Sequence, residues 1–166
     1  MHGTRDLLAE QLKVLFIGYN PSLRSAEINH HYAGNANRFW LMLYEAGFTD
    51  HKLRPEDDQE LLELGLGLTN IVARPTRAAS EITKTEYEEG RELLRVKLER
   101  YQPRYAAYVG IGVYKVFARN PSAALGLQSV SVVHGVQDFV LPSTSGLNRM
   151  LNAEMLNWYR SLKALI

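Results

Sequence analysis

The 166-residue chain contains no cysteine. This absence excludes disulfide bonds, a thiol nucleophile, and zinc or iron–sulfur sites that depend on cysteine ligands. Long apolar runs are absent as well, so no segment is long enough to cross a bilayer as a helix. The first ten residues carry Arg5, Asp6 and Glu10 and lack the apolar core of a signal peptide. We therefore expect a cytoplasmic protein with no metal site, no cofactor and no membrane partner.

The net charge is also small, because 19 lysines and arginines are balanced by 18 aspartates and glutamates, which leaves +1. The chain therefore lacks the strongly basic surface of a non-specific nucleic-acid binder, and any DNA-binding face must be local and built from a few arginines. Hydrophobic residues make up 46% and charged residues 22%, as in ordinary soluble globular proteins. With no repeat or linker, we expect a single domain over residues 1–166 and a monomer.

Short apolar runs alternate with helical patterns, which predicts a three-layer α/β/α sandwich with a mostly parallel central sheet. We expect strands over residues 14–17, 68–72, 105–109, 130–134 and 138–141, the last two paired across a tight connection at Gly135. Helices are expected over residues 6–12, 36–46, 55–64, 83–101, 113–119 and 151–165. Residues 24–35 and 74–80 are expected to be loops.

The first strand stops abruptly in the stretch Gly18-Tyr19-Asn20-Pro21-Ser22. Glycine permits unusual backbone angles, proline fixes φ, and asparagine and serine side chains can bond nearby backbone, so the stretch predicts a tight turn. Ligands of open α/β sheets bind beyond the carboxyl ends of the strands, which makes the amide of Asn20 a candidate site group. An ordinary strand-ending turn is the alternative interpretation.

A second apolar run, residues 136–141, leads into Pro142-Ser143-Thr144-Ser145-Gly146-Leu147-Asn148-Arg149. Here the chain resembles the uracil-DNA glycosylase superfamily, specifically its mismatch-specific branch, the Mug and thymine-DNA glycosylase group. Residues 36–40 and 73–76 also look like family segments, and the order and spacing agree from Lys13 onward. The superfamily has iron–sulfur branches, which a chain without cysteine cannot join. The resemblance implies a monofunctional glycosylase that excises uracil, thymine, ethenocytosine or another damaged base from G mismatches in double-stranded DNA.

By that resemblance, Asn20 positions the attacking water and Tyr32 stacks on the flipped base. Highly active relatives have an aspartate at the first position, whereas an amide can orient water but cannot accept a proton. Ser143 stands where those relatives have a histidine and where many mismatch-specific relatives have an asparagine. The residues expected to bind the base are Gly18, Tyr19, Tyr32, Asn70 and Ser143.

Leu147 matches the family's wedge, the apolar side chain that fills the hole left by the extruded nucleotide. The resemblance also implies that the backbone around Gly146 and Asn148 contacts the orphaned guanine, and that Arg149 binds phosphate or supports the loop. The alternative is that Leu147 begins the last helix and packs in the core.

Several further residues have open roles. Thr76 is a candidate for the pocket wall, and His30 and His31 are assigned no role, because loop histidines are most often surface residues. Three acidic residues form either a solvated helix face or an alternative water activator: Glu86, Glu88 and Glu89. Four arginines are candidates for phosphate contacts, of which the second and third also suit structural pairs: Arg24, Arg38, Arg74 and Arg77.

Two other functions compete with excision. The first is a catalytically weak lesion- or mismatch-binding protein of the same fold, which the missing acid and histidine favour. The second is a small-molecule α/β enzyme or nucleotide-binding domain. Its nearest signal is Gly110-Ile111-Gly112, which lacks the third glycine of a dinucleotide-binding loop.

Overall fold

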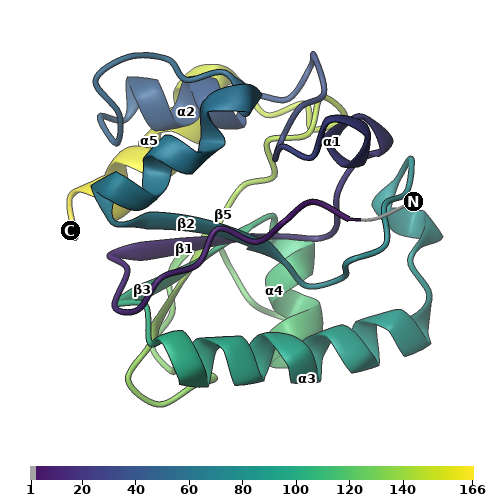
Figure 1. Ribbon diagram of the computed structural model, residues 1–166. Coiled ribbons are helices and arrows are strands. Elements are labelled where there is room, and N and C mark those ends of the chain that lie inside the picture. The colour runs from purple at the N-terminus through teal and green to yellow at the C-terminus, as the bar shows by residue number, and fades with distance from the viewer. Residues whose placement is uncertain (1–2) are drawn as a thin grey trace.

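The computed structural model describes residues 3–166 and contains a five-stranded sheet with helices on both faces (Figure 1). The strands are β1 (Val14–Gly18), β2 (Leu66–Asn70), β3 (Tyr105–Val109), β4 (Gly126–Leu127) and β5 (Gln137–Leu141). The α-helices are α1 (Leu23–Ile28), α2 (Phe39–Glu45), α3 (Lys84–Tyr101), α4 (Ile111–Ala118) and α5 (Asn152–Lys163), and the 3₁₀ helices are η1 (Pro55–Leu64) and η2 (Ala79–Glu81). The strand order is β2-β1-β3-β5-β4, and every neighbouring pair is parallel except β4 and β5.

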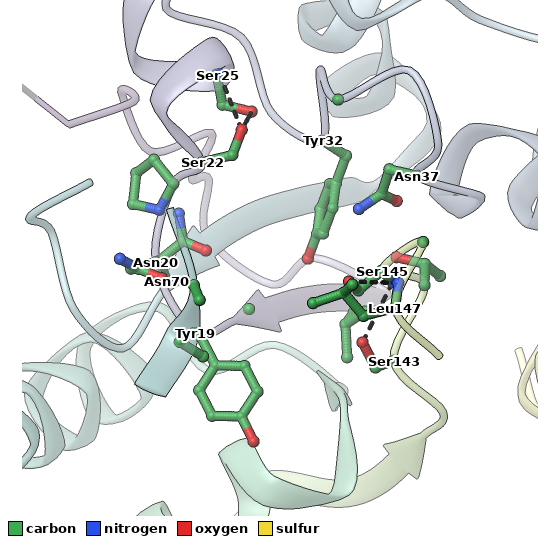
Figure 2. Close-up of a pocket in the computed structure, with 18 of the residues that line it drawn as sticks. Tyr19, Asn20, Ser22, Ser25, Tyr32, Asn37, Asn70, Ser143, Ser145 and Leu147 are labelled. Atoms are coloured by element: carbon green, nitrogen blue, oxygen red, sulfur yellow. Dashed lines mark hydrogen bonds between the residues drawn. The ribbon is translucent and has the colours of Figure 1, made fainter. Parts of the chain in front are cut away.

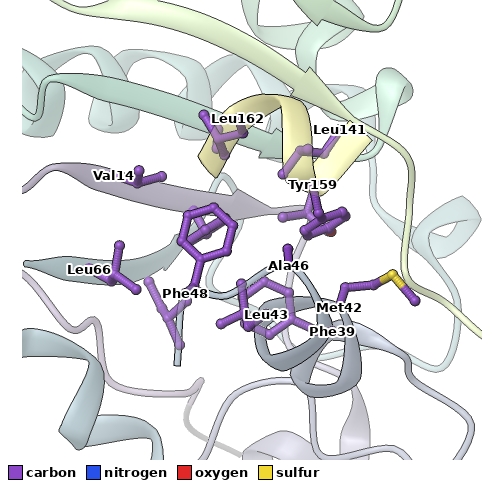
Figure 3. Packing of buried hydrophobic residues seen from close by; sticks show 14 of the residues in the cluster. Val14, Phe39, Met42, Leu43, Ala46, Phe48, Leu66, Leu141, Tyr159 and Leu162 are labelled. Carbon is purple, nitrogen blue, oxygen red and sulfur yellow. The ribbon is translucent and has the colours of Figure 1, made fainter. Parts of the chain in front are cut away.

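The two faces of the sheet are both buried because alternate side chains of each strand point to opposite faces. On β1, Val14 and Phe16 pack against α2, η1 and α5, whereas Leu15 and Ile17 pack against α3 and α4. Figure 3 shows the first of these cores, in which Phe39 and Leu43 of α2 meet strand residues and α5. The predicted three-layer α/β/α sandwich is confirmed.

The connections out of the strands leave a crevice at one end of the sheet. The chain leaves β1 toward the layer of α2 and α5, whereas it leaves β2 and β3 toward the layer of α3 and α4. Where neighbouring parallel strands send their connections to opposite faces, the carboxyl ends of the strands stay uncovered. The carboxyl ends of β1 and β2, at Gly18 and Asn70, are therefore left uncovered by the connections.

The predicted helix over residues 6–12 is wrong. Leu7 instead forms an antiparallel bridge with Leu68 at the outer edge of β2, and its N–H and C=O both bond Leu68, at 2.9 and 3.0 Å. An uncovered edge strand leaves backbone groups without partners, and this segment supplies them. The N-terminal segment therefore caps the sheet and does not form a helix.

The predicted hairpin of residues 130–134 and 138–141 is wrong as well. β5 pairs in parallel with β3 and antiparallel with β4, and residues 130–134 are irregular. The N–H of Val132 donates to the carboxylate of Asp138 at 3.1 Å. That side-chain acceptor holds the segment in place of a strand ladder.

Smaller differences concern element bounds. The predicted loop over residues 24–35 begins with α1, which Ser22 caps by accepting the N–H of Ser25 and which ends at Asn29 in the left-handed region. Residues 55–64 form a 3₁₀ helix, and the strand expected over 68–72 lies at Leu66–Asn70. The long helix α3 is confirmed, together with its Thr83 and Glu86 capping box. Within residues 3–166 no helix is long and apolar enough to span a membrane.

Candidate functional site: a pocket at the carboxyl ends of the strands

A pocket of about 540 Å³ lies beyond the carboxyl ends of β1, β2 and β5 (Figure 2). Its walls come from the loop after β1, the loop before α2, the end of β2, the 76–79 segment and the loop after β5. Of the ten predicted site residues, nine line it: Gly18, Tyr19, Asn20, Tyr32, Asn70, Ser143, Gly146, Leu147 and Asn148. Arg149 follows them on the exposed side of the loop. Segments far apart in the sequence therefore meet in one site.

The amide of Asn20 is held in one orientation. Its Nδ2 donates to the carbonyl of Arg74 at 2.7 Å and to Oγ1 of Thr76 at 2.8 Å. Thr76 donates its own hydroxyl proton to the carbonyl of Ala78, so its oxygen must accept from Asn20. Because a carbonyl oxygen can only accept, the amide nitrogen must face Arg74. The Oδ1 of Asn20 thus remains available as an acceptor for a molecule in the pocket.

The acidic residues near the pocket do not offer a proton acceptor. Glu86 takes two hydrogen bonds from the guanidinium of Arg74, at 2.8 and 2.9 Å, and bonds from the Thr83 cap. The Arg74 guanidinium, with the backbone N–H of Thr83, lowers the pKa of Glu86 to about 2. Glu88 and Glu89 are exposed and lie outside the pocket. A general-base role for these glutamates has no geometric support.

Tyr32 forms an aromatic wall. Its ring stacks on Phe39 with centroids 3.9 Å apart, and its backbone adopts the left-handed region at φ 52°. Burial raises the pKa of its hydroxyl, which has no hydrogen-bond partner among the described residues. A Cβ built on Gly18 would lie 3.0 Å from that hydroxyl and 2.7 Å from Oδ1 of Asn70. Glycine at position 18 is therefore what lets these two polar groups approach the end of β1.

Tyr19 lines the pocket, and its ring extends from the loop after β1 toward the start of α4 (Figure 2). A Cβ on Gly112 would lie 1.7 Å from the Tyr19 hydroxyl, and one on Gly110 would lie 3.5 Å from its ring. Gly112 therefore makes room for the tyrosine at the start of α4, whereas a Cβ on Gly110 would only be in ordinary van der Waals contact with it. The role of Tyr19 in base binding stays a prediction. The packing of Tyr19 accounts for Gly112, and a positive φ of 120° accounts for Gly110, so this stretch has a structural explanation without a bound nucleotide.

The loop after β5 presents Leu147 to solvent. The side chain of Leu147 is 85% exposed, so the alternative in which it packs in the core is wrong. Its loop is nevertheless ordered by internal bonds: Asn148 Nδ2 donates to the Ser143 carbonyl at 2.8 Å, and the N–H of Leu147 donates to Oγ of Ser145 at 3.2 Å. Figure 2 shows this loop across the pocket from Asn20 and Asn70.

His31 and Thr4 are among the pocket residues that sequence analysis missed. His31 is buried, its Nε2 donates to the carbonyl of Arg5 at 2.8 Å, and burial lowers the pKa of its imidazole. Thr4 lines the same wall, and its Oγ1 is buried without a partner among residues 3–166. The N-terminal segment runs along the outer edge of β2, carries Thr4 to the pocket and accepts the hydrogen bond from His31. No local sequence signal reveals that path.

The four candidate arginines have different surroundings. Arg24 pairs with Glu27, and Arg74 pairs with Glu86. The guanidinium of Arg38 donates hydrogen bonds to the loop after β5, which fits the structural role. Arg77 is exposed and lines the pocket. Arg77 is thus the best placed of the four to meet a phosphate.

The fold and the pocket define an α/β protein whose ligand site lies at the carboxyl ends of a parallel sheet. In residues 3–166 no group of three or more His, Cys, Asp or Glu side chains is placed to bind a metal. The chain belongs to the uracil DNA glycosylase superfamily, whose family model matches residues 6–163. Membership supports a DNA glycosylase activity in DNA repair, with DNA as the partner.

A solved structure with the same fold is the solution NMR structure of a candidate uracil DNA glycosylase from Methanosarcina acetivorans. The two chains are 23% identical, the alignment covers 97% of each, and the TM-score is 0.61. At this identity the likeness shows that the whole chain shares the fold.

Proposed function

We propose that the protein is a mismatch-specific, monofunctional DNA glycosylase that excises uracil from G·U pairs by base flipping and water attack. The orientation of the Asn20 amide carries this proposal. Its nitrogen is committed to Arg74 and Thr76, so its oxygen is the group presented to a water molecule. Superfamily membership and the neighbouring M. acetivorans fold support the same reaction class.

The chemistry requires little from the protein beyond positioning. The N–C1′ bond of the nucleotide breaks, its electron pair leaves with the base as a uracil anion, and the water oxygen bonds C1′. The displaced water proton passes to solvent or to the base, since neither Asn20 nor the Arg74-bound Glu86 is suited to hold it. Orientation of the water and backbone N–H groups near the base oxygens would supply the rate enhancement.

The walls of the pocket suit a flipped pyrimidine. The ring face of Tyr32 opposite Phe39 would stack on the base, and the amide of Asn70 offers both donors and an acceptor to its edge. Leu147, exposed at the rim, would fill the hole in the duplex, and Arg149 and Arg77 would meet the phosphates. Extrusion of a base costs a few kcal/mol, least at a mismatch, which favours a mismatched substrate.

The first prediction is a single-turnover test on a labelled G·U duplex, with enzyme in excess and abasic product read after alkaline cleavage. Asn20→Ala is expected to lose excision by about 10²-fold or more, the usual loss when a positioned polar group is removed. Its affinity for the duplex should stay near that of the parent. Asn20→Asp introduces a proton acceptor that the parent lacks and is expected to exceed the parent in rate.

The controls separate the competing functions. Excision rates on G·T and ethenocytosine duplexes show which bases the protein removes, and the rate on an A·U duplex shows whether it requires an opposite G. Tight binding of G·U duplex by the parent protein without any abasic product would replace excision with the lesion-binding function. If Asn20→Ala excised uracil at the parental rate, Asn20 would not be the residue that positions the water.

A further inference from the structure

Arg38 joins the base pocket to the loop that carries Leu147, here called the wedge loop (residues 144–152). Its Nη1 donates to the carbonyl of Met150 at 2.6 Å and to Oδ1 of Asn152 at 2.9 Å, and its Nη2 donates to the carbonyl of Asn148 at 2.8 Å. Its backbone N–H donates to the carbonyl of Thr144 at 3.0 Å. One residue thus holds both ends of the wedge loop.

The chemistry of these contacts selects arginine. The acceptors are uncharged carbonyl oxygens on either side of Arg149 and at the start of α5, and together they take three donors of one planar guanidinium. A lysine ammonium is a compact point charge and does not present that fork. Three of the five N–H donors of Arg38 are thus used within the protein, which favours a structural role over a phosphate contact.

The wedge loop also packs directly on the lip of the base pocket. A Cβ built on Gly146 would lie 2.5 Å from the Cβ of Ala36, two residues before Arg38. Ala36 and Asn37 themselves line the pocket. The backbone of the wedge loop is therefore fixed against the pocket while the side chain of Leu147 stays 85% exposed. A group ordered before binding loses less freedom on insertion.

We propose that Arg38 is a positioning residue for base flipping, which holds Leu147 at a fixed place relative to the pocket that receives the base. This inference rests on the proposed glycosylase function, because it acts through the wedge. Arg38 touches neither the base nor the reacting bond. Its loss should therefore affect duplex DNA, in which a hole must be filled, and spare single-stranded DNA.

The second prediction uses Arg38→Met, which keeps the length of the side chain but removes every donor. On G·U duplex we expect roughly a tenfold loss of excision, equivalent to about one strong hydrogen-bonded contact. On single-stranded uracil DNA the rate should stay within about twofold of the parent, because such DNA has no stack to repair. Arg38→Lys, the second variant, keeps the charge and should recover only part of the duplex rate.

A double-mutant cycle with Leu147→Ala separates positioning from general support of the fold. Leu147→Ala alone should lose about tenfold on duplex through lost apolar contact. If Arg38 acts through Leu147, adding Arg38→Met to Leu147→Ala should change the duplex rate little further. Arg100→Met is the matched control, because it removes the same charge from the far end of α3, where Arg100 pairs with Glu10.

A binding readout keeps the inference testable if chemistry is slow. 2-Aminopurine placed beside the mismatch reports unstacking, and its fluorescence increase with Arg38→Met should be smaller than with the parent or Arg100→Met. Additive losses in the cycle, or equal losses on duplex and single-stranded DNA, would overturn the positioning role. A parent that unstacks the reporter but yields no product on any substrate would overturn the proposed reaction alone.

Discussion

Two polar clusters on the same sheet differ in how completely their hydrogen bonds are used. At the start of β5, the fully buried carboxylate of Asp138 accepts from the hydroxyls of Tyr108 and Tyr114, at 3.3 and 3.1 Å, and from the N–H of Val132 at 3.1 Å. At the carboxyl ends of the strands, the hydroxyls of Thr4, Tyr32 and Thr144 line the pocket and have no partner among residues 3–166.

The difference separates polar groups that hold the fold from polar groups that serve a ligand. Buried polar groups in folded proteins are nearly always paired, and an unpaired one costs about 1–3 kcal/mol. Of the four buried, unpartnered side-chain atoms in residues 3–166, three line the pocket, and the fourth is the hydroxyl of Tyr159 in the core. We expect the Asp138 cluster to set stability and the pocket cluster to set excision.

The third prediction, with the largest effect on stability, removes the centre of the satisfied cluster. Asp138→Ala leaves two tyrosine hydroxyls and one N–H without an acceptor, so the free energy of unfolding should fall by about 3 kcal/mol. Excision at a temperature where the variant stays folded should match the parent. Urea denaturation and the G·U assay measure the two quantities. A loss of excision with an unchanged free energy of unfolding would mean that the Asp138 cluster does not set stability alone.

The fourth prediction removes one hydroxyl from each cluster by the same chemical change. Tyr114→Phe deletes a donor to Asp138 and should lower the free energy of unfolding by about 1 kcal/mol while leaving excision unchanged. Tyr32→Phe deletes a hydroxyl with no protein partner, so the free energy of unfolding should stay level or rise. If substrate uses that hydroxyl, excision should fall about fivefold, the equivalent of about 1 kcal/mol.

The pair is informative because each variant controls for the other. The opposite outcome, a destabilised Tyr32→Phe with full activity, would mean that the pocket hydroxyls serve the fold. Tyr32→Ala, which removes the ring as well, then tests stacking separately from hydrogen bonding.

Two segments of the pocket could be predicted from local sequence, whereas the roles expected of Tyr32 and Leu147 came from the family resemblance. An apolar strand that stops at Gly18, and another that runs into Pro142, each end in turn residues, and parallel strands bring such ends together. The long helix α3 was equally predictable from the Thr83 and Glu86 capping box. These features depend on neighbours in the chain.

The features that sequence reasoning missed depend on partners far along the chain. Residues 6–12 suit a helix by composition, but Leu7 forms a β-bridge with Leu68 at the edge of β2. Residues 130–134 suit a strand, but the Asp138 carboxylate holds Val132. Thr4 lies on that N-terminal segment, and His31 donates to the carbonyl of Arg5 in the same segment. Tertiary contacts override local propensity at these places.

The last prediction contrasts His31 in the pocket wall with Asp138 by the sign of the pH dependence of stability. Burial lowers the pKa of His31, so between that lowered value and the ordinary pKa of about 6.5 the unfolded chain binds more protons than the folded one. Stability should fall as the pH drops through this window. Burial raises the pKa of Asp138 above the ordinary value of about 3.9, so the folded chain binds more protons there and stability should fall as the pH rises.

Urea unfolding of the parent and two variants, from neutral to acidic pH, separates these contributions. His31→Gln keeps a donor for the Arg5 carbonyl and cannot titrate, so its difference from the parent should grow as the pH falls below about 6.5. Asp138→Asn should differ from the parent most at higher pH, where the parent must hold a buried charge. Subtracting each variant from the parent cancels the remaining histidines, including His51, whose pKa Asp50 raises. A parent and His31→Gln with parallel profiles would show that the pocket wall admits the charged imidazole, and that burial there is weaker than at Asp138.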